Sequence, residues 1–241
     1  VLHTPITDVE QLKFDLVGQL ENIDRDDKVV IVIDSIGNLA SKKELEDAIN
    51  EKSVADMSRA KALKGLFRMV TPYLTMKNIP LLAVNHTYQE MGLFPKQVVG
   101  GGTGIYYSAD NIWILGRKQD KKGTEIKGYH FVINVEKSRF VKEKSKIPVS
   151  VTWEGGIETY SGLLEVALAG GYVTKPNVGW YARVNMETGE IEDTKVREKD
   201  TLSKKFWIPI FEETNFKEFV KTYYSIGHKP LLDIDSVSYT H

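Results

Sequence analysis

A hydrophobic run that ends in an acidic residue carries the strongest chemical signal of this sequence. Residues 29–33 read Val-Val-Ile-Val-Ile, and Asp34 follows them directly. If the run is a parallel strand, Asp34 lies at the strand end where such sheets bind ligands. Its carboxylate could there hold the water shell of a nucleotide-bound Mg²⁺. Hydrophobic strands that end in Asp are common, so an Asp34 that only caps the following turn is an equally good interpretation of this motif alone.

Asn85 and His86 place two more polar side chains after a hydrophobic run, residues 81–84. If both runs are neighbouring parallel strands, these side chains and Asp34 share one edge of the sheet. A polar residue there can contact the γ-phosphate of a nucleotide and pass its presence to the loop that follows. Taken alone, His86 is better interpreted as a histidine whose ring is satisfied by a nearby backbone group.

The loop that follows is rich in glycine, with Gly100, Gly101, Gly102, Thr103 and Gly104 in succession. It is not a phosphate-binding loop of the Gly-x-x-x-x-Gly-Lys-Ser/Thr type, because it lacks the lysine ending and does not follow a strand. Glycines here favour a close approach of backbone amides to an extended phosphate backbone, or a loop that orders on binding. A merely flexible connector is the alternative.

A basic cluster follows a third hydrophobic run, residues 129–135. Its members are Lys137, Arg139, Lys142, Lys144 and Lys146. Such clusters are usually solvated surface, and neighbouring glutamates partly neutralise this one. The functional alternative is that Lys137 and Arg139 act as positioned cations on a phosphate, as arginine fingers do.

Hydrophobic periodicity predicts the elements that must position these residues. Helical spacing predicts an amphipathic helix over residues 8–21, with Asp8 as its N-cap, and a long crossover helix over residues 54–73. The β-branched run 29–33 predicts a central parallel strand covered on both faces, and residues 81–84 predict a second buried strand. The order strand, helix, strand is that of a parallel unit, which indicates an α/β architecture.

The second half of the chain shows a different pattern. Strands are expected at residues 111–115, 129–135 and 149–153, joined by charged loops with Gly123 and Gly155–Gly156 in turns. No internal repeat interrupts this pattern.

A capped helix over residues 161–168 is expected to open a smaller C-terminal domain. The chain would then consist of a core, residues 1–160, and a small domain, residues 161–241. Aromatic side chains are the candidates for the core of that domain: Trp180, Tyr181, Phe206, Trp207, Phe211, Phe216 and Tyr223.

The composition is that of a globular protein without a strong electrostatic bias. Of the 241 residues, 41% are hydrophobic and 27% are charged, which allows a substantial core. The net charge of -1 predicts that any nucleic acid is bound by local basic patches. The absence of cysteine excludes disulfides and fits a cytoplasmic location. No apolar stretch approaches the roughly 20 residues that cross a bilayer, and Val1 in place of an initial Met suggests a truncated or processed chain.

Four of these motifs, in this order and at these separations, resemble the RecA family of recombinases. They are residues 29–39 (VVIVIDSIGNL), 84–86 (VNH), 100–104 (GGGTG) and 134–139 (NVEKSR). The intervening segments are similar to phage members of that family, and the similarity runs over nearly the entire chain. It implies a RecA-like core, a mostly parallel sheet flanked by helices with antiparallel strands at one edge. The core would be incomplete at its N-terminus and followed by a small C-terminal α/β domain.

The resemblance also implies roles for the residues at the sheet edge. Asp34 matches the Walker B carboxylate, which holds Mg²⁺ through water, and Ser35 and Asn85 would lie beside the bound ATP. His86 occupies the γ-phosphate sensor position. That position is a glutamine in bacterial RecA proteins, so the strength of coupling between ATP and DNA is an open question for this chain.

Two DNA-binding segments are implied as well. Residues 41–52 match the first DNA-binding loop of the family, and residues 87–104 match the second. The candidate DNA contacts within them are Ser41, Lys42, Lys43, Lys52, Lys96, Gly100, Gly101, Gly102, Thr103 and Gly104. Lys137 and Arg139 match the two cations that reach into the ATP site of the neighbouring protomer in a filament.

The implied function is ATP-dependent homologous recombination and DNA repair, with filaments on single-stranded DNA and strand exchange. Expected partners are single-stranded and double-stranded DNA, further copies of the chain, and phage single-strand-binding and mediator proteins, but no membrane. The expected location is the cytoplasm, that of the host if a phage encodes the chain. The sequence lacks the family's Walker A loop and catalytic glutamate, so we do not expect this piece alone to hydrolyse ATP.

Two other functions fit the same motifs. A hexameric helicase of the RecA fold also uses a strand-end Asp and basic residues that act between subunits, and it would form closed rings instead of open filaments. A non-enzymatic DNA-binding or assembly module is compatible with the absent phosphate loop, and it would bind DNA without nucleotide.

Overall fold

The computed structural model of the protein describes residues 1–51, 57–90 and 96–227. The chain divides into two compact units, residues 1–110 and 111–241, and each has its own hydrophobic core. The domain boundary expected at residue 160 lies inside the second unit and stays a prediction.

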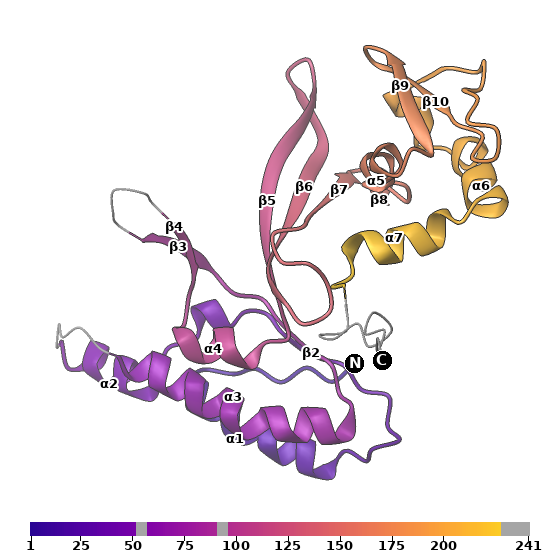
Figure 1. Ribbon diagram of the computed structural model, residues 1–241. Helices are drawn as coiled ribbons and strands as arrows, with labels where there is room; N and C mark the ends of the chain where they lie inside the picture. The colour runs from indigo at the N-terminus through magenta and orange to yellow at the C-terminus, as the bar shows by residue number, and fades with distance from the viewer. Residues whose placement is uncertain (52–56, 91–95, 228–241) are drawn as a thin grey trace, which may run out of the picture. The chain divides into compact units, whose positions relative to one another are not determined.

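The first unit combines helices with short strands (Figure 1). In chain order its elements are α1 (Val9–Asn22), β1 (Ile31–Ile33), a 3₁₀ turn (Ile36–Asn38), α2 (Lys42–Ile49), α3 (Ser58–Lys77), β2 (Leu81–Ala83), β3 (Thr87–Glu90), β4 (Lys96–Val99) and α4 (Thr103–Ser108). β1 and β2 are parallel neighbours, with Ile31 opposite Leu81 and Ile33 opposite Ala83. The strand, crossover helix and strand therefore follow each other as the sequence predicts, and the α/β class is confirmed.

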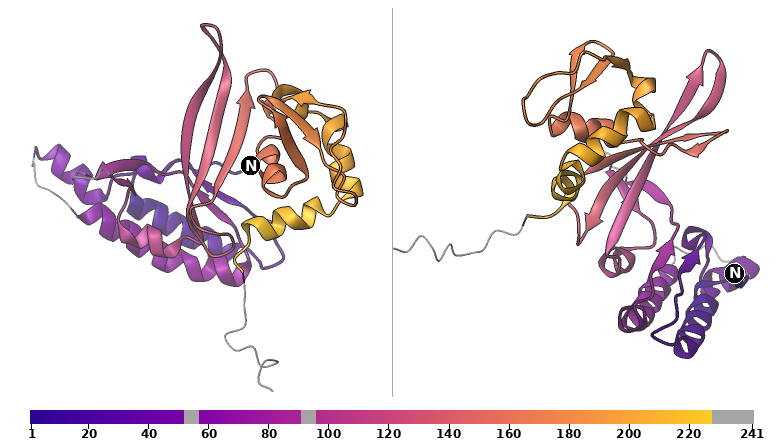
Figure 2. Two further views of the ribbon diagram at one scale, coloured as in Figure 1. Left: turned by 45° about the horizontal axis from the view of Figure 1, so that its top comes forward. Right: turned by 90° about the vertical axis from the view of Figure 1, so that its right-hand side faces the viewer.

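The core of this unit lies between the two long helices and one face of the β1–β2 pair. α1 and α3 run side by side (Figure 1, Figure 2), and Leu16, Leu66 and Val70 are among the side chains that they bury. The carboxylate of Asp8 accepts a hydrogen bond of 2.7 Å from the backbone amide of Gln11, so the expected N-cap of α1 is confirmed.

The expectation that the strand at residues 29–33 is covered on both faces is wrong. Val30 is 58% exposed and Val32 is 65% exposed, and large parts of Leu82 on β2 and of Val84 directly after it are exposed as well. Successive side chains of a strand point to opposite faces, and α1 and α3 cover only the face to which Ile33 contributes. Within the described residues, the opposite face of this strand pair is uncovered.

The second unit begins with an antiparallel sheet of four strands in the order β5-β6-β7-β8. These strands are Asn111–Lys122, Glu125–Ser138, Lys146–Thr152 and Gly156–Ile157. β5 and β6 form a long twisted hairpin (Figure 2) that extends well beyond the strands expected from the sequence. Gly123 lies in its turn with a φ of 66°, as the glycine pattern predicts.

The rest of this unit packs around aromatic side chains. Its elements are α5 (Leu163–Ala169), β9 (Val173–Asn177), β10 (Trp180–Arg183), β11 (Val196–Arg197), a 3₁₀ turn (Glu198–Thr201), α6 (Lys204–Glu213) and α7 (Phe216–Tyr224). Trp207 is fully buried, with the rings of Phe206, Phe211 and Phe216 within 6.0 Å of its own. Burial raises the pKa of Tyr172, whose hydroxyl donates a hydrogen bond to Asn215.

The helix expected at residues 161–168 is present but begins later. Ser161 does not cap it, because its hydroxyl donates to the carbonyl of Glu158. Gly162 precedes the helix with a φ of 80°, a left-handed conformation that favours glycine. Among the described residues, no helix is both long enough and apolar enough to cross a membrane.

Candidate functional site

Asp34 and His86 lie at the same edge of the β1–β2 pair. The parallel register places Asp34 and Val84 directly after paired residues. The amide of Val84 donates to the carbonyl of Ile33 at 2.9 Å, and the amide of Ile36 donates to the carbonyl of Val84 at 3.0 Å. The two chain segments therefore stay paired just beyond the strands. Both Asp34 and His86 are exposed, so a ligand can reach either side chain.

Gly37 supports the ring of His86 from the turn that follows Asp34. A β-carbon on Gly37 would lie 2.8 Å from Cγ of His86 and within 3.1 Å of two further ring atoms. No real β-carbon tolerates such a distance, so only glycine permits the ring to pack here. The contact joins the Asp34 segment directly to the His86 side chain. The sequence motif contains Gly37, but its spacing gives no sign of this contact.

Exchanging Gly37 for alanine should displace the His86 ring without unfolding the chain. An exposed ring can rotate away from the added methyl group, so the free energy of unfolding should change by about 1 kcal/mol or less. The ring resonances of His86 in an NMR spectrum should shift clearly. The matched control is Gly18→Ala in α1, where an added β-carbon has no atom within 4 Å. A folded Gly37→Ala variant with unshifted His86 resonances would show that Gly37 does not position the His86 ring.

His86 is also tied to the beginning of the glycine-rich segment. The carbonyl of His86 accepts a hydrogen bond of 2.9 Å from the amide of Gly100. The side chain of Asn85 donates to the carbonyl of Gly100 at 2.8 Å and accepts from the amide of His86 at 2.9 Å. The carboxamide of Asn85 thus holds the strand end and Gly100 together. A nucleotide contact by Asn85 or by Ser35 stays a prediction.

The segment expected as the second DNA-binding loop contains regular structure. β3 and β4 form an antiparallel hairpin in which Thr87 faces Val99 and Glu90 faces Lys96 (Figure 1). The side chain of Lys96 and residues 91–95 lie outside the described part, so the DNA contact expected for Lys96 stays a prediction. The hairpin is exposed along β3.

Close packing against α3 and positive φ angles explain the glycines after Gly100. A β-carbon on Gly104 would lie 2.7 Å from Cβ and 2.9 Å from Cα of Lys64. Gly101 and Gly102 have positive φ angles of 87° and 80°, which favour glycine. Thr103 then begins α4, a helix that the sequence pattern does not predict. The segment therefore forms a turn that packs against α3.

This packing sets the glycine-rich turn beside basic side chains that the sequence interpretation missed. Lys61, Lys64 and Arg68 are exposed on α3 at the spacing i, i+3, i+7, opposite the buried face of that helix. Their helical spacing in the sequence is the signal that could have identified them as one basic face. Three like charges on one helix face, next to exposed backbone of the turn, can attract phosphates.

Arg59, at the start of α3, is a second residue without a sequence signal. Its guanidinium donates to the carbonyl of Leu39 at 2.7 Å, of Ile36 at 2.8 Å and of Gly37 at 3.1 Å. Arg59 therefore fixes the turn between Asp34 and α2 through its backbone carbonyls. Carbonyl acceptors leave no trace in the side-chain sequence, so this contact could only come from the structure.

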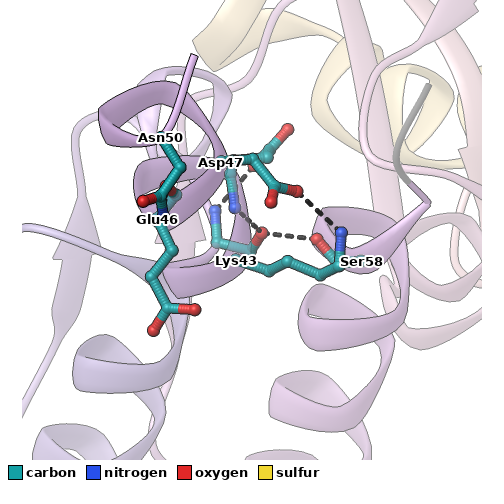
Figure 3. A network of polar contacts seen from close by, with 7 residues as sticks. Lys43, Glu46, Asp47, Asn50 and Ser58 are labelled. Atoms are coloured by element: carbon teal, nitrogen blue, oxygen red, sulfur yellow. Dashed lines mark hydrogen bonds and ion pairs between the residues drawn. The ribbon is translucent and has the colours of Figure 1, made fainter. Parts of the chain in front are cut away.

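The start of the expected first DNA-binding loop is a capped helix. Ser41 is fully buried, its hydroxyl accepts from the amide of Glu44 at 3.2 Å, and it lies 2.6 Å from the hydroxyl of Ser58. Figure 3 shows Lys43, Asp47 and Ser58 close together, and Lys43 forms an ion pair of 2.7 Å with Asp47. In this conformation the hydroxyl of Ser41 serves the fold, so a DNA contact by Ser41 would require the start of α2 to open.

The structure does not test the DNA contacts predicted for the lysines of this loop. Lys42 and Lys43 are exposed on α2. Lys52 lies outside the described residues.

Lys137 and Arg139 flank the end of β6 in the second unit. Between them, Ser138 is nearly buried and donates a hydrogen bond of 2.7 Å to the side chain of Asn111. The same hydroxyl accepts from the amides of Phe140 and Val141, both at 3.1 Å. Ser138 thereby fixes the turn in which the two cations lie. Their contact with a nucleotide of another subunit stays a prediction.

The donor set at the sheet edge suits a nucleotide-bound magnesium ion. Within the described residues, no group of three or more His, Asp or Glu side chains could hold a metal ion by itself. Mg²⁺ commonly retains several waters and needs only one or two carboxylates beside the phosphates of a nucleotide. The single exposed carboxylate of Asp34 fits that mode and not a protein-only metal cage.

Comparison with known proteins gives one family model and a series of relatives. Residues 160–220 match the family described as Bacteriophage T4, Recombination and repair protein, C-terminal domain. The chain is 54% identical over 231 residues to the recombination and repair protein of Enterobacteria phage T4. This match covers 94% of the chain and 59% of the T4 protein.

Bacterial relatives are more distant. RecA of Aquifex aeolicus is 26% identical over 164 residues, which cover 67% of the chain and 47% of that protein. RecA of Bacteroides thetaiotaomicron is 22% identical over 194 residues, or 78% of the chain and 58% of that protein. The chain thus spans about half to three fifths of the length of these relatives.

Proposed function

Since the chain belongs to the RecA-related recombination and repair proteins, we propose that it acts in ATP-dependent homologous recombination on single-stranded DNA. The observation that carries this proposal is the convergence of Asp34, His86 and the glycine-rich turn at one edge of a parallel strand pair. A nucleotide there would lie within reach of the carboxylate of Asp34, which would bind magnesium through water. It would also lie within reach of His86, whose backbone is hydrogen-bonded to Gly100 in the expected DNA-binding segment.

Asp34 and His86 have separate roles in this proposal. The carboxylate of Asp34 orients the water shell of Mg²⁺, which supplies charge compensation on the phosphates when the nucleotide is bound. His86 contacts the γ-phosphate and moves when that contact is made or lost. Because its carbonyl and the side chain of Asn85 are both bonded to Gly100, a movement of the strand end changes the position of the turn.

The DNA would lie across the glycine-rich turn and the exposed cations of α3. Backbone amides and basic side chains bind the phosphate backbone without reading bases, as a protein that tests homology by base pairing requires. Lys61, Lys64 and Arg68 join the expected contacts at Gly101, Gly102 and Thr103 in this surface.

Lys137 and Arg139 complete the proposal between subunits. They would reach the nucleotide bound by a neighbouring copy, so that nucleotide binding and filament assembly depend on each other. Double-stranded DNA as the second substrate, strand exchange, and phage single-strand-binding and mediator proteins as further partners follow from the same relationship.

Replacing His86 with alanine tests the sensor role. The suitable protein is a chimera that joins this chain to the part of the T4 relative that it does not cover. Fluorescence anisotropy of a labelled oligonucleotide gives its affinity for single-stranded DNA with and without a non-hydrolysable ATP analogue and Mg²⁺. We expect the analogue to tighten binding by about 10-fold in the parent and hardly at all in His86→Ala.

The control is His3→Ala, which changes the same residue type in an exposed N-terminal segment. It should retain the full effect of the analogue. Equal tightening in the parent and in His86→Ala would rule out the sensor role.

A further inference from the structure

The base of the α2 excursion is tied directly to the turn behind Asp34. The described part of the excursion is α2, residues 42–49, and the hydroxyls of Ser41 before it and Ser58 after it lie 2.6 Å apart. Arg59, the next residue, donates to three carbonyls of the segment between Asp34 and Ser41. Four adjacent contacts, one between the two serines and three from Arg59, therefore hold Ser41, Ser58 and the nucleotide-side turn together.

Arg59 is well suited to hold this turn in one conformation. Its guanidinium is always charged, planar and equipped with several donors in a fixed fork. The three accepting carbonyls belong to Ile36, Gly37 and Leu39, which form the 3₁₀ turn and its end. A lysine in the same place would keep the charge but would present its donors from a single atom, so it could not span the same set of carbonyls.

The turn held by Arg59 is the one that positions the His86 ring. Gly37 has no side chain, and the His86 ring packs so closely against it that a β-carbon at this position would collide with the ring. Its carbonyl is one of the three that Arg59 binds. A shift of Arg59 would therefore displace Gly37, on which the His86 ring packs, and a shift of the ring would act on Gly37 through the same contact.

We propose that Arg59 is a positioning residue that couples the α2 excursion to the nucleotide-side turn, by a route separate from the bonds between His86 and Gly100. This inference rests on the proposed function, because it assumes that α2 meets DNA and that Asp34 and His86 meet the nucleotide. Binding at the excursion shifts Ser58 and Arg59, and Arg59 passes the shift to Gly37 and to His86.

The test is Arg59→Lys, which preserves charge and helical propensity. In the chain itself, hydrogen exchange at the amides of Ile36 and Leu39 should accelerate by about 10-fold, and the ring resonances of His86 should shift. In the chimera, the tightening of single-stranded DNA binding by the ATP analogue should fall from about 10-fold to less than about 3-fold. Affinity for DNA without nucleotide should stay within about twofold, which a merely unfolded site would not allow.

The matched control is Arg25→Lys, an exposed arginine of the turn between α1 and β1. It should leave the exchange rates, the His86 resonances and the response to the ATP analogue unchanged. A parent chimera without any response to the analogue would contradict the proposed function, and the inference would then be decided by exchange and resonances alone. Unchanged exchange and unshifted His86 resonances in folded Arg59→Lys overturn it, as does a full response to the analogue.

Discussion

Replacing Asp34 with asparagine should lower DNA-dependent ATP hydrolysis by the chimera with the T4 relative by at least about 100-fold. Asparagine matches aspartate in size, so the turn and its contacts with Arg59 should survive. What is lost is the negative charge that orients the water shell of the magnesium ion. Release of phosphate in the presence of single-stranded DNA measures the effect directly.

Asp26→Asn provides the control for this change. Asp26 is an exposed carboxylate in the turn between α1 and β1, in the same unit but away from the sheet edge. Its replacement removes the same charge and should leave hydrolysis within about twofold of the parent. If Asp34→Asn also retained hydrolysis at that level, Asp34 could not be the magnesium-binding carboxylate.

The second large effect concerns stability, where Trp207→Ala should reduce the free energy of unfolding by about 3–5 kcal/mol. Trp207 is 0% exposed, and its ring stacks on those of Tyr160 and Phe216 at 6.3 and 5.8 Å. Alanine would leave a cavity that the surrounding rings cannot fill without moving. Urea unfolding followed by far-UV circular dichroism measures the loss without depending on tryptophan fluorescence.

Trp207→Phe separates the loss of packing from the loss of the indole. The indole Nε1 of Trp207 is buried and has no hydrogen-bond partner among the described residues. Phenylalanine removes that unpaired donor and retains one ring, so its cost should be much smaller than that of alanine. Equal losses for both variants would contradict the view that ring packing at this position holds the C-terminal core together.

The sequence predicted the parts of the fold that depend on local patterns. The helix after Asp8 has both a helical apolar period and a capping residue, and the structure contains it with that cap. The two apolar runs, residues 29–33 and 81–84, are parallel neighbours, as the crossover helix between them predicts. Asp34 and His86 consequently lie at one edge, which is the part of the site that strand order alone could establish.

The parts that sequence reasoning missed depend on contacts between distant residues. The glycines after Gly100 were interpreted as allowing backbone amides to approach a phosphate backbone, whereas Gly104 allows a close approach to Lys64 of α3. The sequence analysis did not predict α2, although Ser41 and Glu44 have the spacing of a capping box and Leu45, Ala48 and Ile49 that of a helix face. Arg59 binds only backbone carbonyls, and such acceptors are the same at every position of a chain.

The strand at residues 29–33 shows the opposite error, a pattern interpreted too strongly. An unbroken apolar run is typical of a strand covered on both faces, but Val32 is 65% exposed here. An apolar run shows only that both faces of the strand could be buried. Coverage depends on what packs against them, and in the described residues only α1 and α3 do so on one side.

The most direct measurement is a cryo-electron microscopy map of the chimera assembled on single-stranded DNA with Mg²⁺ and a non-hydrolysable ATP analogue. We expect the γ-phosphate within about 3 Å of the His86 ring, a magnesium-bound water at Asp34, and Lys137 and Arg139 of the adjacent subunit on the same nucleotide. A nucleotide bound away from the edge that Asp34 and His86 share would contradict it.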